Sequence, residues 1–107
     1  MEDDEDEPRD LVLSAVDRGL DVFGSSVRFV VYYELKKEHG IEPEEIPDKP
    51  ELLVATIEKI FGQGAEKVSS AICKELQMIT GIEGLAQKDL LTALRSAYDD
   101  QLSRKSA

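Results

Sequence analysis

Residues 46–65 limit the fold more than any other stretch, because they contain a helix start, an amphipathic run and a helix stop in close succession. Asp48 precedes Glu51 by three residues, which is the spacing of a capping box. Pro50 suits the first turn of that helix, because the amide that proline lacks would have no partner there. Gly62 then opens a Gly-Gln-Gly stretch, which predicts a tight connection with a positive φ angle. The sequence therefore predicts one well-delimited helix between two turns.

Four further helices are predicted from apolar residues that recur every three or four positions. Their apolar stripes are Leu13, Val16, Leu20 and Phe23, then Val27, Val31 and Leu35, then Val68, Ile72, Leu76 and Ile79, and finally Leu91, Leu94, Tyr98 and Leu102. Residues 29–33 favour a strand on propensity alone, but the run continues through cationic side chains to Gly40, as helix C-termini do. We therefore predict an all-α protein, a compact bundle of four core helices plus a C-terminal fifth helix, with no β-sheet.

The domain organisation follows from length and charge. A chain of 107 residues is the size of one ordinary domain. Residues 2–7 are all acidic, and like-charge repulsion without apolar anchors predicts a disordered acidic tail over residues 1–8. Residues 9–102 are expected to form a single helical domain, and the polar residues 103–107 a flexible C-terminal tail.

Short signals also predict how consecutive helices are joined. Gly24 offers a left-handed C-terminal cap to the first helix. Ser25 or Ser26 can then accept hydrogen bonds from the free amides of the second. Ile41 and Ile46 are expected to hold the loop before the third helix against the core.

The second helix, residues 27–39, is apolar nearly all round over its first two turns. Such a helix is either central to its domain or shared between a core and a partner. In the second interpretation Phe29, Tyr32 and Tyr33 form part of a subunit or protein interface, since aromatic residues are enriched in such patches. The sequence leaves both interpretations open.

Charge narrows the range of partners. The formal net charge is −10, and the residues outside 2–7 carry 17 acids and 13 bases. Phosphate backbones bind proteins through clustered Lys and Arg, so this balance disfavours nucleic acid as a partner. No apolar run approaches the roughly 18 residues that span a bilayer, and the N-terminus is acidic where a signal peptide would be basic. We therefore expect a cytoplasmic protein with no membrane association.

Patterns of catalytic and metal-binding residues are missing from the sequence. Cys73 is the single cysteine and His39 the single histidine, so neither an internal disulfide nor an ordinary zinc site is expected. The spacing of a helical carboxylate metal site fails as well, because Lys36 stands where a Glu-x-x-His pair requires glutamate. Gly62-x-Gly64 follows a helix instead of a strand, unlike a dinucleotide fingerprint. We expect no catalytic residue, no metal and no cofactor, with Cys73 as a small buried side chain.

Several short motifs resemble a known family. They are Phe23-Gly24-Ser25-Ser26-Val27, Tyr32-Tyr33-Glu34-Leu35, His39-Gly40-Ile41, Ile46-Pro47-Asp48-Lys49-Pro50 and Ile60-Phe61-Gly62-Gln63-Gly64-Ala65. Over about residues 11–76 the chain is similar to the nitrosopumilus output domain family, small archaeal helical domains found alone or at the C-terminal end of archaeal signalling proteins. The resemblance implies a signal-output or interaction module, and its motifs define a scaffold without naming a molecular target.

These features predict a non-enzymatic signal-output or protein–protein interaction module that acts on a protein partner or as a homodimer. The first alternative is a nucleic-acid-associated regulator, which a basic stripe on the surface would favour. The second alternative is an enzyme with an unrecognised carboxylate site. It would need a deep pocket in which two acids converge.

Overall fold

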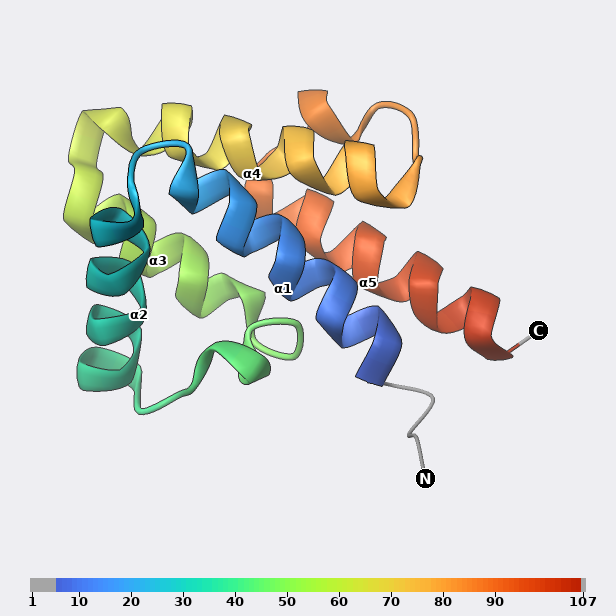
Figure 1. Ribbon diagram of the computed structural model, residues 1–107, viewed down its shortest axis with the longest axis horizontal. Helices are drawn as coiled ribbons and strands as arrows, with labels where there is room; N and C mark the ends of the chain where they lie inside the picture. The colour runs from blue at the N-terminus through green and yellow to red at the C-terminus, as the bar shows by residue number, and fades with distance from the viewer. Residues whose placement is uncertain (1–5, 107) are drawn as a thin grey trace.

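The computed structural model describes residues 6–106, which are helical apart from short connections (Figure 1). The α-helices are α1 (Asp6–Asp21), α2 (Ser25–His39), α3 (Pro50–Phe61), α4 (Ala65–Thr80) and α5 (Leu90–Ser106). Single turns of 3-10 helix lie between them at η1 (Pro43–Glu45), η2 (Gly62–Gly64) and η3 (Leu85–Gln87). No strand occurs within residues 6–106, so the predicted all-α fold is confirmed, including the fifth helix.

Helix α4 is central to the bundle, because α1, α3, α5 and η3 all pack against it. Figure 1 shows α4 along the top of the view, with α1 and α5 descending side by side beneath it. Helix α2 stands at the left edge of the same view and packs mainly against α1 and α3. The molecule therefore has one central helix and one peripheral helix of nearly equal length.

The close crossing of α1 and α4 depends on Gly19. A β-carbon at this position would lie 2.6 Å from Cγ1 of Ile72 and 2.7 Å from its Cα atom. Protein interiors are already close-packed, and backbone atoms cannot move aside as a flexible side chain can. Glycine at position 19 thus sets how closely the two helices approach.

The core contains most of the predicted apolar stripes. Buried members of those stripes are Val16, Leu20, Val31, Leu35, Val68, Ile72, Leu76, Leu94 and Tyr98. Leu53 and Ile57, from the amphipathic run within residues 46–65, are buried as well. In α1 the buried face also includes Val12 and Ala15, whereas Leu13 is only partly buried. Phe23, the last residue of the predicted stripe, lies beyond the end of α1 and is 40% exposed. Helical spacing permits several neighbouring faces, and α4 covers the one that carries the small residues Ala15 and Gly19.

Residues 40–49 form the loop between α2 and α3, and Ile41 and Ile46 are buried there, as predicted. A capping box does occur in this loop, but at η1. The backbone amide of Glu42 donates to the Glu45 carboxylate at 3.0 Å. In return, the Glu42 side chain accepts a hydrogen bond from the backbone amide of Glu45. This reciprocal pair satisfies amides at the start of η1.

The capping box predicted from Asp48 and Glu51 is wrong. Helix α3 begins after Lys49 without any side-chain cap, although Pro50 does occupy its first position. The Asp48 carboxylate instead accepts a hydrogen bond of 2.8 Å from Nη1 of Arg9, in the first half of α1. The Asp48 carboxylate, which local spacing predicted to cap α3, thus makes a charge-assisted hydrogen bond with Arg9, a residue distant in sequence.

Arg9 joins three parts of the fold. Its guanidinium donates to the Glu44 carbonyl at 2.9 Å and to the Tyr98 hydroxyl at 3.1 Å, in addition to Asp48. The guanidinium carbon also lies 5.7 Å from the centre of the Tyr98 ring, which is cation–π range. These contacts fasten α1 to the η1 loop and to α5.

The expected serine cap of α2 is also wrong. Helix α2 begins directly after Gly24 with no side-chain cap, so neither Ser25 nor Ser26 has the predicted role. Gly24 has a φ angle of 109°, but α1 already ends at Asp21, so Gly24 is not its left-handed cap. The predicted positive φ is confirmed at Gly62, where it is 53°.

Both ends of the described chain are helical beyond the predicted domain boundaries. Residues 1–5 of the predicted acidic tail lie outside the described residues, but residues 6–8 belong to α1 and Pro8 is buried. Proline fits there, because amides in a first helical turn have no intrahelical partner. At the other end α5 continues to Ser106, through most of the predicted tail at residues 103–107.

Candidate functional site

Helix α2 has an inner face and an outer face of similar apolar character. Val31 and Leu35 are fully buried against the rest of the bundle. On the other side Phe29, Tyr33 and Val30 are 74%, 63% and 47% exposed. We define the outward face of α2 as the exposed residues Ser26, Phe29, Val30, Tyr33, Lys36 and Lys37.

The exposure of this face follows from the position of α2. Residues three and four apart are neighbours on a helix surface, so Tyr33 lies beside both Val30 and Phe29, and the three residues form one apolar strip. Helix α2 packs mainly on α1 and α3, and both neighbours lie on its inner side. Of the two interpretations that the sequence left open, full central burial is therefore wrong for this helix. Contiguous exposed apolar side chains mark an interaction site more often than isolated ones do.

The acidic residues of α2 are directed towards α3. Nζ of Lys59 on α3 lies 3.6 Å from the carboxylate of Glu34 and 3.1 Å from that of Glu38. The hydrogen bond from Lys59 holds the pKa of the Glu38 carboxyl below its ordinary value, and the same bond raises the pKa of Lys59. These acids help to seat α2 on the bundle.

The two lysines of α2 lie on the other side, whereas Arg28 is directed towards α1. Lys36 donates to the carboxylate of Glu42, and this bond raises the pKa of the Lys36 ammonium. Nζ of Lys37 lies 5.9 Å from the centre of the Tyr33 ring and, among the described residues, makes no ion pair. The outward face thus combines apolar and cationic side chains and contains no carboxylate.

Tyr32 lies between the two faces. Its hydroxyl donates to the carboxylate of Asp17 on α1, and burial together with this bond raises its pKa above the ordinary tyrosine value. Arg28 flanks the bond, with Nε 3.1 Å from Asp21 and Nη1 3.9 Å from Asp17. Tyr32, predicted as an interface residue with Phe29 and Tyr33, is thus partly buried and fastens α2 to α1.

A small hollow adjoins the outward face at this point. It is lined by Arg28, Phe29 and Tyr32 and has a volume of about 120 Å³. The exposed Phe29 ring forms one wall, while Arg28 and Tyr32 are held by their bonds to α1. A side chain of a partner that packed along Phe29 could enter it.

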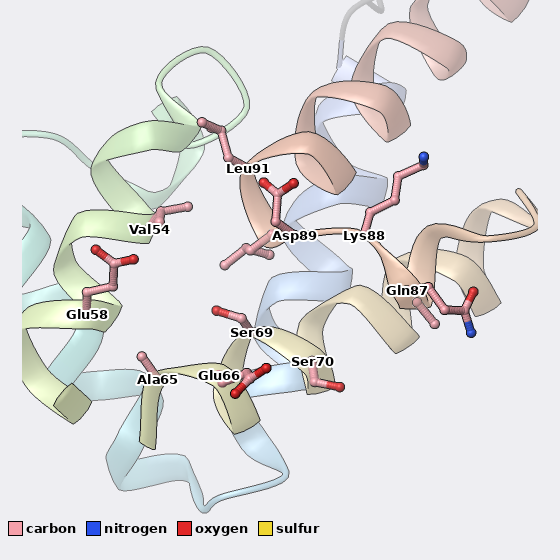
Figure 2. A pocket seen from close by; sticks show the side chains of 12 residues that line it. Val54, Glu58, Ala65, Glu66, Ser69, Ser70, Gln87, Lys88, Asp89 and Leu91 are labelled. Carbon is pink, nitrogen blue, oxygen red and sulfur yellow. The ribbon is translucent and has the colours of Figure 1, made fainter. Parts of the chain in front are cut away.

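A larger open cleft of about 660 Å³ lies between α3, α4 and the start of α5 (Figure 2). Its acidic residues are Glu58, Glu66 and Asp89, which come from three different segments. Figure 2 shows their side chains spaced around the cleft instead of pointing at one another. Two serines, Ser69 and Ser70, also line it, but no histidine does.

One of these acids has a structural role. The Asp89 carboxylate accepts a hydrogen bond of 3.1 Å from the Thr92 amide at the start of α5. Hydrogen bonds from Thr92 lower the pKa of Asp89, as expected of a carboxylate that caps a helix. Within residues 6–106, no group of three or more His, Cys, Asp or Glu side chains is placed to hold a metal ion.

The single cysteine and the single histidine are not brought together. Cys73 is buried, and its thiol donates to the Lys88 carbonyl across 3.4 Å. Burial, with a smaller contribution from the charge of Asp89, raises the pKa of this thiol to about 11. His39 is exposed at the end of α2. A thiol with a raised pKa is a poor nucleophile at neutral pH.

A search of protein families, curated proteins and solved structures finds no match to this chain. The resemblance to the nitrosopumilus output domain therefore stays a prediction carried by the sequence motifs alone. None of the helices in residues 6–106 combines the length and the apolar composition needed to cross a membrane.

Sequence reasoning missed two parts of the outward face. Val30 was not included with Phe29 and Tyr33, although its position beside Phe29 on the second apolar side was a sufficient signal. The hollow beside Phe29 had no local signal, because it depends on ion pairs from Arg28 to α1.

Proposed function

We propose that this protein is a non-enzymatic protein–protein interaction module that binds a partner through the outward face of α2. The observation that carries the proposal is the exposure of Phe29, Val30 and Tyr33 on a helix that buries Val31 and Leu35 on its other face. Leaving such a strip in water costs roughly 25 cal/mol for each Å² of apolar surface, and a partner that covered it would recover that free energy. The family resemblance points the same way, towards a cytoplasmic signal-output role in an archaeal cell.

The test is partner recovery with a matched pair of variants. Full-length tagged protein is incubated with an extract of its native cells, as the wild type, as Phe29→Ser with Tyr33→Ser, and as Met78→Ser. Met78 is the control, because it is 73% exposed but lies on α4. We expect the same proteins with the wild type and Met78→Ser, and their loss with the double variant. Equal recovery by all three would contradict the proposal.

A nucleic-acid-associated role is the competing proposal, because aromatic and cationic side chains lie together on the outward face. Two observations weigh against it. Lys36 is already bonded to Glu42, and the formal net charge of −10 repels a phosphate backbone. Nucleic acid that co-purifies with the wild type and is released steeply by added salt would favour this role instead.

A further inference from the structure

We infer that the natural occupant of the outward face of α2 is an acidic amphipathic helix of a partner protein. This inference rests on the proposed function and adds the chemistry of the partner. Its basis is the way in which α2 divides its charged side chains between its two sides.

The two glutamates of α2 and its two lysines lie on different sides of the helix. Glu34 and Glu38 are both engaged by Lys59 on the side of α3. Lys36 and Lys37 belong to the outward face, where Lys36 is already bonded to Glu42 and Lys37 makes no ion pair with the described residues. A partner surface that brought carboxylates beside Lys37 would complete an ion pair that the described residues do not provide.

The shape of the outward face suits a helix. Helix α2 has 15 residues, which corresponds to a length of about 22 Å. Phe29, Val30 and Tyr33 form a short apolar strip, and Lys36 and Lys37 follow it one turn further along the helix. A helix lying along this strip would present an apolar stripe to it and place its own flanking carboxylates near Lys37. The hollow lined by Arg28, Phe29 and Tyr32 could receive one side chain of that stripe.

A second copy of the chain is a poorer occupant. A two-fold contact between two α2 helices would set a carboxylate-free cationic face against an identical one. Electrostatic complementarity therefore favours a different protein with an acidic, partly apolar helix.

The test uses three synthetic helical peptides that share one leucine stripe and carry glutamate, glutamine or lysine beside it. Each is titrated into the full-length protein labelled with ¹⁵N, and amide shifts locate the contact. We expect the glutamate peptide to bind at least about tenfold more tightly than the lysine peptide, with the glutamine peptide between them. The shifted amides should include those of residues 26–37.

Variants separate this inference from the proposed function. Lys37→Glu should reduce the difference in affinity between the glutamate and lysine peptides, or reverse it. Phe29→Ser should weaken the binding of all three peptides, and Met78→Ser should leave their affinities unchanged. If the three peptides bound with equal affinity and Phe29→Ser still weakened them, the inference of an acidic partner would be overturned. The proposal that the outward face of α2 binds a partner would still stand. Affinities indifferent to Phe29→Ser, or no binding of any peptide, would count against both.

Two further measurements test whether a second copy of the chain or a nucleic acid occupies the outward face instead. Light scattering that finds a dimer in the wild type and a monomer in Tyr33→Ala would make a second copy the occupant, which overturns the inference. A single-stranded oligonucleotide that bound more tightly than the glutamate peptide would also overturn it. A monomer that prefers the glutamate peptide to the oligonucleotide is the expected result.

Discussion

Helices α2 and α4 differ by one residue in length but have opposite places in the molecule. Helix α4 is packed by α1, α3 and α5, and its apolar stripe Val68, Ile72 and Leu76 is buried. Helix α2 is packed mainly by α1 and α3, so it buries Val31 and Leu35 and leaves its second apolar strip exposed. Whether an apolar side chain is buried thus depends on which helices pack against its own helix. The neighbours of α2 cover only part of its apolar surface.

The largest effect is expected on the inner face of α2. Leu35→Ala removes a fully buried side chain and should lower the free energy of unfolding by about 3 to 4 kcal/mol, because it leaves a cavity in the core. Denaturant unfolding followed by circular dichroism measures the loss. A loss below about 1 kcal/mol would contradict the division of α2 into a core face and an outward face.

The central place of α4 is tested at its crossing with α1. Gly19→Val should lower the free energy of unfolding by about 2 to 3 kcal/mol, because the new side chain would meet the backbone of Ile72. Ala55→Val is the matched control, since Ala55 is exposed on α3. It should cost less than about 1 kcal/mol, mainly from the lower helix propensity of valine. Equal losses in the two variants would mean that the crossing tolerates a side chain.

The connection that leads into α4 should show a smaller effect. Gly62 has φ 53° and ψ −118°, a conformation that other residues rarely adopt, while nothing lies within 4 Å of an added β-carbon. Gly62→Val should therefore cost about 2 kcal/mol from backbone strain alone. Gly64→Ala is the control, because Gly64 has a φ angle of −81° and ample space. Thermal unfolding of the pair would refute the argument if Gly62→Val melted like the wild type.

The bond that fastens α2 to α1 should contribute about 1 kcal/mol, which Tyr32→Phe removes. The folded protein raises the pKa of Tyr32 above the ordinary value of 10.0, so it holds this proton more tightly than the unfolded chain does. The stabilisation is therefore complete below about pH 10 and declines as the pH rises above it.

The free energy of unfolding, measured across alkaline pH, tests this predicted loss of stability. The wild type should lose more stability above pH 10 than Tyr32→Phe does, whereas Tyr33→Phe, with an exposed ring on the same helix, should follow the wild type. Parallel curves for the wild type and Tyr32→Phe would show that folding does not raise the pKa of Tyr32.

Periodicity in the sequence was sufficient to predict the helices, because the apolar stripes and the glycine stops are local signals. Local spacing also predicted helix caps at Asp48 and at Ser25 or Ser26, and these predictions are wrong. Arg9 is 39 residues away from Asp48 in sequence, and only the folded chain brings its guanidinium to that carboxylate. The role of Gly19 was missed for the same reason, since a close crossing is a property of two helices and not of one.

The candidate site was predictable in part. One of the two interpretations of α2 made Phe29 and Tyr33 interface residues, and both side chains are exposed in the structure. Tyr32 was grouped with them because periodicity does not indicate which boundary residue finds a hydrogen-bond partner on another helix. The charge sorting of α2 likewise became visible only when Lys59 was located beside Glu34 and Glu38.

The central claim is that the inner face of α2 stabilises the fold and that the outward face binds a partner. Binding of the glutamate peptide to Tyr33→Ala, measured where the wild type and the variant are both fully folded, tests it most directly. Tyr33 is 63% exposed, so its removal should change the free energy of unfolding by no more than about 0.5 kcal/mol. We predict near wild-type stability together with at least about tenfold weaker binding, as expected on removing an aromatic interface residue. Unchanged binding, or stability lost in parallel with binding, would contradict the account.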